Sequence, residues 1–330
     1  MKAIVTGGAG FIGSNLVDAL VKKNIKVTVI DNLSTGQTKN LKKSISKIKF
    51  VKIDISKQTR KLESLFKNVD FVFHLAGLAD IVPSIKNPKK YFEANVNGTL
   101  NVLEACKNKK IKKFIYAASA SCYGLPTSFP TSENAKIDTK YPYALTKFLG
   151  EKLVMHYASI FKMPNISLRF FNVYGLRSRT TGAYGAVFGV FLAQKISNKP
   201  LTVVGNGKQT RDFVHVTDLV HAIIKTARSK IENKIFNVGS GKETTVNKIA
   251  NLIGGKKVSI PKRPGEPDRS CADISKIRSQ IGWKPTVSIN QGVKDLLLNI
   301  QDWKNAPIWT PKKIKKATKE WFKSLKKNEK

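Results

Sequence analysis

A glycine-rich turn near the start of the chain constrains its fold more than any other feature. The apolar run Ala3–Thr6 has strand character, and a helix-like segment begins a few residues later. Two glycine spacings fit between them: Gly8, Gly10 and Gly13 make GxGxxG, and Gly7, Gly10 and Gly13 make GxxGxxG. Glycines allow a tight turn and a close approach of the backbone to a pyrophosphate, which the positive end of the following helix attracts. The order strand, turn, helix therefore predicts a dinucleotide-binding unit.

Strand-like and helix-like segments alternate through the first half of the chain. The expected strands are Ala3–Thr6, Val27–Asp31, Phe50–Ile53, Phe71–Leu75, Phe114–Ala117 and Ile166–Arg169. Long helices are expected near Pro88–Asn108 and from about Pro142 to Phe161. This alternation predicts an α/β fold, a Rossmann-type doubly wound parallel sheet with a smaller C-terminal substrate-binding lobe. We expect a nucleotide-binding domain in residues 1–175, a lobe in 176–310 with segments that return to the sheet, and a basic amphipathic tail in 311–330.

Composition excludes several classes of protein. With 330 residues, of which 41% are hydrophobic and 25% charged, the chain can bury a sizeable core. No apolar run reaches the roughly 18 residues of a membrane helix, and the first residues lack the apolar stretch of a signal peptide. Cys106, Cys122 and Cys271 are far apart and lack zinc-ligand spacing. We therefore expect a cytoplasmic protein with no disulfide framework and no metal.

The net charge of +37 is unusual, with 59 basic residues against 22 acidic ones. Such a field attracts anions. The basic residues are mostly lysines spread through the chain, as in Lys42-Lys43 and Lys256-Lys257, whereas a nucleic-acid site would be more concentrated and interleaved with aromatic residues. The pattern favours lysine-rich solvated faces, and we expect no specific nucleic-acid partner.

The lysine-rich C-terminal segment is compatible with two interpretations. From Pro311 onward, Ile314, Ala317, Trp321 and Leu325 fall on one helical face, with lysines elsewhere. We favour a terminal helix whose apolar face packs on its own domain. The alternative is a basic amphipathic helix that makes weak contact with an anionic surface.

Asp31 ends the second expected strand, at the position where a carboxylate can bind the diol of an adenosine ribose. A carboxylate there also repels a 2′-phosphate, and the next residues, Asn32 and Leu33, include no arginine that would attract one. The alternative interpretation is an ordinary turn residue. With the glycine turn ahead of it, Asp31 favours NAD over NADP.

Three residues form a candidate catalytic group. Tyr143 and Lys147 lie one helical turn apart, so that the ammonium can favour the phenolate and lower the pKa of the tyrosine, together with a positive nicotinamide ring. Alone, YxxxK is a common accident on helices. Ser119, however, follows the strand Phe114–Ala117, whose carboxyl end faces the cofactor cleft in a parallel sheet. The three residues together predict proton transfer coupled to hydride transfer.

These motifs together resemble the extended short-chain dehydrogenase/reductases. The residues that carry the resemblance are TGGAGFIG, DNLSTG at Asp31–Gly36, HLAG at His74–Gly77, the Ser119 segment and YALTK at Tyr143–Lys147. Within the superfamily the chain is similar to NAD-dependent nucleotide-sugar epimerases of the UDP-glucose and UDP-N-acetylglucosamine 4-epimerase type. The similarity runs from residue 2 to about 300 and continues through Leu168–Gly175, Gly205–Val216 and Arg263–Glu266.

The resemblance implies a role for each matching residue. Tyr143 is the base, Ser119 assists it, and Lys147 binds the nicotinamide ribose. The implied cofactor-binding residues are Gly7, Gly10, Phe11, Ile12, Gly13, Asp31, Asn32, Asp54, Ile55, Leu75, Ala76, Gly77, Asn95, Tyr143 and Lys147. The implied substrate-binding residues are Ser119, Asn172, Arg211, Arg263, Glu266 and Ser270. Ser270 borders the C2 substituent of the sugar, where a small residue leaves room for an N-acetyl group.

The reaction implied by the resemblance is 4-epimerisation of a UDP-hexose through a transient 4-keto sugar. Related dehydratases carry acidic residues just after the catalytic hydroxyl residue, where this chain has Ala120 and Ser121. Two alternatives remain: another reaction of the superfamily, such as UDP-glucuronate epimerisation, dehydration or reduction, and a non-catalytic NAD-binding scaffold. The resemblance also implies a homodimer formed by the two long helices.

Overall fold

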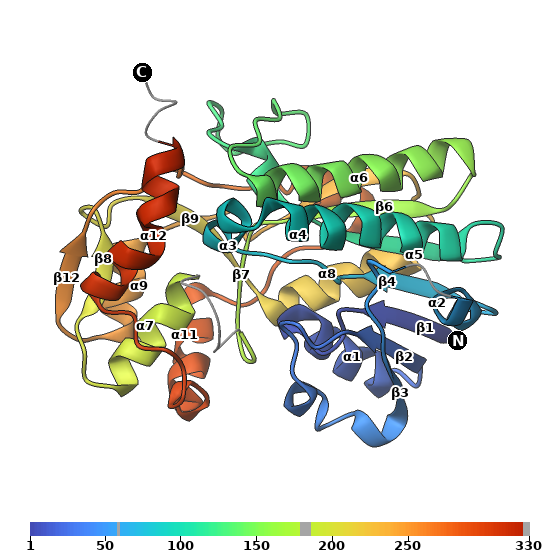
Figure 1. Ribbon diagram of the computed structural model, residues 1–330, viewed down its shortest axis with the longest axis horizontal. Helices are drawn as coiled ribbons and strands as arrows, with labels where there is room; N and C mark the ends of the chain where they lie inside the picture. Colours follow the sequence, from blue (N-terminus) through green and yellow to red (C-terminus); the bar gives the residue numbers. More distant parts are fainter. Residues whose placement is uncertain (58–59, 179–185, 326–330) are drawn as a thin grey trace.

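The computed structural model describes residues 1–57, 60–178 and 186–325. Its central layer is a seven-stranded parallel sheet in the order β10-β6-β5-β4-β1-β2-β3 (Figure 1). The strands are β1 (Lys2–Thr6), β2 (Lys26–Asp31), β3 (Ile48–Lys52), β4 (Phe71–His74), β5 (Lys113–Ser119), β6 (Asn165–Phe170) and β10 (Lys234–Val238). All six predicted strands are present, and β10 comes from the second half of the chain. The predicted Rossmann-type fold is confirmed.

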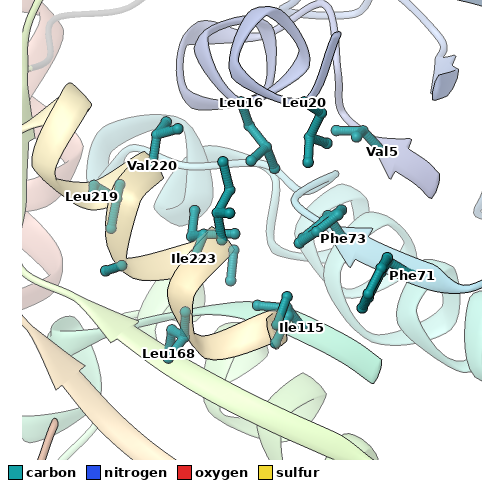
Figure 2. Close-up of a cluster of buried hydrophobic side chains, with 14 of the residues drawn as sticks. Val5, Leu16, Leu20, Phe71, Phe73, Ile115, Leu168, Leu219, Val220 and Ile223 are labelled. Atoms are coloured by element: carbon teal, nitrogen blue, oxygen red, sulfur yellow. The ribbon is translucent and has the colours of Figure 1, made fainter. Parts of the chain in front are cut away.

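Helices cover both faces of this sheet, because alternate strand residues point to opposite sides. On one face Ala3 and Val5 join a core with α1 (Phe11–Lys22) and α8 (Val216–Arg228), where Leu16, Leu20, Leu219 and Ile223 meet Phe73 and Ile115 (Figure 2). On the other face Ile4 joins α2 (Arg60–Leu65), α5 (Gly98–Cys106) and α6 (Pro142–Ile160). The sheet is therefore buried on both sides.

The two expected long helices differ in their regularity. α6 begins at Pro142, a residue that suits the first turn of a helix because it needs no N–H partner there, and it ends one residue before the predicted limit. The segment near Pro88–Asn108 is interrupted: α4 (Pro88–Phe92) passes into a π-helical turn, η3 (Glu93–Asn97), and then into α5. α3 (Ile81–Lys86) precedes it.

A second lobe follows β6, with its own core around Tyr174, Phe191 and Trp303. Its sheets are β11-β9-β7 and β12-β8. Its strands are β7 (Asn172–Tyr174), β8 (Leu201–Val204), β9 (Thr210–His215), β11 (Glu243–Thr245) and β12 (Lys257–Ile260). Helices in this part of the chain are α7 (Val187–Ile196), α9 (Val246–Ile253), α10 (Ser275–Ile281), α11 (Ile289–Leu298) and α12 (Pro311–Leu325). Residues 179–185 of the predicted lobe and 326–330 of the predicted tail lie outside the described residues.

The favoured interpretation of the C-terminal helix is confirmed, because α12 packs on its own fold: Ile314 and Trp321 are buried. Along the described parts of the chain, no helix combines the length and hydropathy needed to cross a membrane. Cys106, Cys122 and Cys271 are free thiols and are buried.

Candidate active site

The sheet order reverses between β1 and β4, and a cavity of about 820 Å³ opens at the carboxyl ends of these strands. A topological switch point of this kind is where open α/β sheets bind ligands. The predicted cofactor residues in its lining are Gly7, Gly10, Phe11, Ile12, Gly13, Asp31, Asn32, Asp54, Ile55, Leu75, Ala76, Gly77, Tyr143 and Lys147. Part of the opposite wall comes from the second lobe, including Phe188, Trp303 and Trp309.

The glycine turn leaves no room for side chains, which supports close approach of a pyrophosphate. Gly7 has a φ of +70°, and a Cβ built on it would lie 2.7 Å from the backbone nitrogen of Ala76. A Cβ on Gly13 would lie 2.2 Å from the oxygen of Gly7. A Cβ built on Gly8 would instead lie 2.7 Å from Cγ1 of Val29, and Gly8 is absent from the described cavity lining. The spacing that borders the cavity is therefore Gly7, Gly10 and Gly13, and α1 begins directly beside it.

Asp31 fastens this turn to the end of β2. Its side chain is 7% exposed; Oδ2 accepts a hydrogen bond from the N–H of Ala9 at 3.0 Å and Oδ1 one from Leu33 at 2.8 Å. Burial raises the pKa of Asp31, and the two N–H donors oppose that rise. The carboxylate also lines the cavity, where a ribose diol could reach it.

Three lysines line the cofactor cavity, although the sequence did not place them near it. The segment η1 (Thr38–Leu41) and the residues after it bring Lys39, Lys42 and Lys43 into the cavity lining. The loop is held in place because the side-chain amide of Asn40 donates to the backbone oxygen of Ala9 at 2.9 Å. The lysines and the glycine turn line the same cavity because of this loop conformation, which the sequence pattern does not indicate.

The candidate catalytic hydroxyl groups meet at the carboxyl end of β5. The phenol of Tyr143, in the first turn of α6, donates to Oγ of Ser119 at 3.1 Å. The N–H of Ser121 donates to the same Oγ at 3.2 Å and fixes its position. Two elements far apart in sequence thus place a serine and a tyrosine hydroxyl where one substrate oxygen could contact both.

The ionisation of this pair differs from the sequence-based expectation. We expected the ammonium of Lys147 to help lower the pKa of Tyr143, whereas burial raises the pKa of this phenol in the protein itself, and the hydrogen bond with Ser119 opposes the rise. Burial also lowers the pKa of Lys147 to about 7, while the charge of Glu151 opposes that shift. The Nζ of Lys147 lies 4.4 Å from the centroid of the Tyr116 ring. Burial is therefore the largest cause of the shift in each of the two groups.

Asn95 lies behind the cavity wall instead of in the described lining. It is 1% exposed, and its side chain accepts from the N–H of Leu78 at 2.7 Å and donates to Leu78 O at 3.0 Å. It also donates to Oγ1 of Thr146 at 3.0 Å. From the π-helical turn η3, Asn95 therefore joins the segment after β4 to α6. Direct contact with a cofactor stays a prediction.

Three predicted substrate residues come together beside a second hollow of about 550 Å³. Arg263 Nη1 lies 2.9 Å from Oε1 of Glu266, and Arg211 Nη2 lies 3.6 Å from Oε2 of the same carboxylate. Arg211 also donates to the backbone oxygen of Pro267 at 2.8 Å. Two guanidinium groups share one carboxylate, so the group carries a net positive charge that suits an anionic ligand.

Four of the six predicted substrate residues are not among the described lining residues of either hollow: Ser119, Asn172, Arg211 and Ser270. Asn172 is exposed at the start of β7. Ser270 is half-buried and follows Arg269, which borders the second hollow. Their contacts with a sugar nucleotide stay predictions.

Ser121 and Glu151 complete the site, although the sequence did not single them out as site residues. The hydroxyl of Ser121 is buried with no hydrogen-bond partner among the described residues, and it lies close enough to Tyr143 to help lower the pKa of the phenol. Glu151 raises the pKa of Lys147. In the sequence, only spacing could have indicated their roles: Ser121 lies two positions after Ser119, and Glu151 lies one helical turn after Lys147.

Comparisons with known proteins agree with this geometry. The model of the NAD dependent epimerase/dehydratase family matches residues 3–239. The UDP-glucose 4-epimerase of Mycolicibacterium smegmatis is 33% identical over 304 residues, covering 89% of this chain and 96% of that protein. The structure of UDP-N-acetylglucosamine 4-epimerase from Methanobrevibacter ruminantium, in complex with UDP-N-acetylmuramic acid, aligns with a TM-score of 0.84 at 33% identity, covering 90% and 98% of the two chains.

A further neighbour was solved with the cofactor. The UDP-glucuronic acid 4-epimerase of Bacillus cereus, in complex with UDP-glucuronic acid and NAD, aligns with a TM-score of 0.84 at 32% identity, covering 92% of this chain and 99% of that chain. The matched region includes the glycine turn, Asp31 and the Ser119, Tyr143 and Lys147 group. NAD is therefore the cofactor, and the chain belongs to the NAD-dependent epimerase/dehydratase family of the short-chain dehydrogenase/reductase superfamily.

Proposed function

We propose that this protein inverts C4 of a UDP-hexose through a transient 4-keto sugar. The substrates would be UDP-N-acetylglucosamine and UDP-N-acetylgalactosamine, UDP-glucose and UDP-galactose, or both pairs. The observation that carries the proposal is the 3.1 Å hydrogen bond between Tyr143 and Ser119 beside the cofactor cavity. A 4-hydroxyl placed between these groups can lose its proton while hydride leaves C4.

The residues of the cavity fit the cofactor. The crowded turn at Gly7 and Gly13 would hold the pyrophosphate, Asp31 the adenosine ribose, and Lys147 the nicotinamide ribose. When bound, NAD supplies the site that accepts hydride from C4 and returns it. Because the same hydride goes back to the sugar, the reaction is redox-neutral over one turnover.

Proton transfer is assigned to Tyr143. The phenolate takes the proton from O4 as the carbonyl forms, and the phenol returns it when the keto sugar is reduced on the opposite face. Since burial raises the pKa of Tyr143, hydroxyl donors and nearby cations must favour the phenolate. Ser119, Ser121 and protonated Lys147 are the groups of this chain that can do so.

The diphosphate is assigned to Arg211 and Arg263. Their guanidinium groups share Glu266, which on binding can turn to the hydroxyl groups of the nucleoside ribose. A diphosphate held by two arginines lets the keto sugar rotate about its tether without leaving the cleft. Retention of the keto intermediate is what separates epimerisation from release of an oxidised product.

UDP-glucuronate 4-epimerisation is the second candidate, because the Bacillus cereus neighbour acts on that sugar nucleotide. Dehydration is disfavoured because Ala120 and Ser121 stand where related dehydratases carry acids. The small side chain of Ser270 supports acceptance of an N-acetyl group at C2.

We also propose a homodimer in the cytoplasm. Phe92 in α4 is 44% exposed and Leu145 in α6 is 43% exposed, so apolar side chains project from both helices that the resemblance assigns to the interface. Burying these side chains between two copies would remove apolar surface from water.

A panel of UDP-sugars, with products identified by NMR, tests the proposal. We expect C4 inversion with no keto sugar released. Tyr143→Phe should lower kcat by about 10²–10⁴-fold, the range typical of a positioned proton-transfer group. The matched control is Tyr157→Phe on the same helix, whose hydroxyl bonds Glu104 away from the cavity. Bound NAD without turnover would indicate a scaffold, and a released keto or dehydrated product would indicate another reaction.

A further inference from the structure

Helix α12 buries its apolar face on a loop that the proposed function assigns to the substrate. Trp321 is 2% exposed, and its indole N–H donates to the backbone oxygen of Pro264 at 3.0 Å. The next residue, Gly265, has a φ of +70°, and a Cβ built on it would lie 3.0 Å from Cδ1 of Leu325. The loop is therefore held against α12 by a buried hydrogen bond and by close packing.

Arg263 extends this contact to the charged group. Its guanidinium carbon lies 5.6 Å from the ring centroid of Trp321, and its Nη1 lies 2.9 Å from Oε1 of Glu266. A guanidinium within about 6 Å of an indole ring face is attracted by the ring quadrupole. The side chain of Arg263 is thus held between an aromatic ring and a carboxylate, and its planar fork has a defined direction.

The same helix also contacts the other half of the molecule. α12 packs against α3, and Figure 1 shows the two helices side by side. α3 directly follows the segment Leu75–Asp80, which lines the cofactor cavity. At the other end of α12, Ile314 is buried in the core of the second lobe. α12 therefore joins an element beside the cofactor cavity to the loop that carries Arg263.

From these contacts we infer that Trp321 is a positioning residue for Arg263, and that α12 fixes the direction from which this arginine meets the substrate diphosphate. The inference rests on the proposed function, which assigns Arg263 to the diphosphate. Trp321 contacts no reacting atom and acts through Arg263 and Pro264. An arginine that is already held loses less freedom on binding, so substrate affinity increases while the chemical step stays the same.

The test compares two tryptophan variants in the full-length protein loaded with NAD. Trp321→Phe keeps an aromatic ring but removes the N–H donor to Pro264. The control is Trp283→Phe, because Trp283 is fully buried in the main core and its N–H donates to the backbone oxygen of Asp218 at 3.1 Å. Each variant loses one buried hydrogen bond, but only the bond of Trp321 has its acceptor, Pro264, on the loop that carries Arg263.

Calorimetric titration with UDP gives the affinity, and steady-state rates separate kcat from KM. Trp321→Phe should weaken UDP binding by about 2- to 10-fold, the cost of ordering one long side chain on binding, and raise KM while kcat stays within about twofold. Trp283→Phe should lower the melting temperature and leave UDP affinity unchanged. Equal UDP affinity in the wild type and Trp321→Phe overturns the positioning role.

A double variant separates positioning from general stability. In an Arg263→Ala background, Trp321→Phe should cause no further loss of UDP affinity, because its effect passes through the arginine. Additive losses overturn the inference and leave the assignment of Arg263 intact. Unchanged UDP binding in Arg263→Ala alone instead overturns that assignment. If Trp321→Phe does not fold, Leu325→Ala provides the test: a smaller loss of UDP affinity supports the inference, and none overturns it.

Discussion

Replacing Glu151 with glutamine should destabilise the protein strongly, because it removes the charge that balances Arg169 inside the fold. Arg169 donates to Glu151 through Nη2 at 2.6 Å and through Nε at 3.0 Å, and the side chains are 4% and 2% exposed. Removing one partner of a buried ion pair typically costs about 3–5 kcal/mol, since the other charge stays buried without compensation. We expect Glu151→Gln to lower the free energy of unfolding by that amount.

Urea unfolding measures this change, and a second pair of variants tests its cause. Glu151→Leu combined with Arg169→Met should cost less than the sum of the two single changes, because it removes both desolvated charges. Part of the cost should remain, since Arg169 also donates to the Tyr123 hydroxyl at 2.8 Å and to Glu133 O at 3.0 Å. A loss below about 1 kcal/mol in Glu151→Gln, or strictly additive losses, would refute the reasoning.

Glu151→Gln should also change the pH dependence of the reaction. The charge of Glu151 opposes the burial that lowers the pKa of Lys147 to about 7. Without this charge the pKa of Lys147 falls further, so less of the lysine carries a proton at neutral pH. As the pH rises, the kcat of Glu151→Gln should therefore begin to fall at a lower pH than the kcat of the wild type. An unchanged profile in a folded variant would show that Glu151 acts on stability alone.

Three further changes test separate parts of the site and the fold. Asp31→Ala should weaken NAD binding and reduce the discrimination against NADP, which titration with both dinucleotides would show; an unchanged preference removes Asp31 from the site. Burial lowers the pKa of His74 to about 3, so between pH 6.5 and 3 only the unfolded chain gains this proton, and the free energy of unfolding should fall by about 1.4 kcal/mol per pH unit as the pH decreases. In His74→Asn, urea unfolding should show a smaller fall of this free energy as the pH decreases. An equally steep fall would assign the pH dependence to other groups. Ser270→Tyr should abolish turnover of acetylated UDP-sugars only, and equal loss with plain UDP-sugars would reject its role beside C2.

Features that depend on local pattern were predictable from the sequence. The six predicted strands and the glycine turn follow from runs of apolar residues and from the conformational freedom of glycine, both of which act over a few residues. The pairing of Ser119 with Tyr143 followed from placing each residue on its element, because the carboxyl ends of parallel strands face one cleft.

Features that depend on tertiary contacts were not predictable. The π-helical turn at Glu93–Asn97 has no local signal, and its Asn95 bonds Leu78 and Thr146 on other elements. Trp321 was expected on an apolar helix face, but its partner Pro264 lies 57 positions away in a loop. Periodicity shows which residues of a helix are buried, but it does not show what covers them.

The electrostatics of the site explain why its chemistry depends on the bound cofactor. Burial raises the pKa of Tyr143 and lowers the pKa of Lys147, so the fold disfavours the charged form of each group. A phenolate at neutral pH then requires a further positive charge beside the tyrosine, and Lys147 can supply only part of it, since near pH 7 it is partly neutral. The positive nicotinamide ring of NAD⁺ is a cation that the cleft would place there. More of the tyrosine is thus phenolate when oxidised cofactor is bound, and in the proposed reaction that is the state that would accept hydride from the sugar.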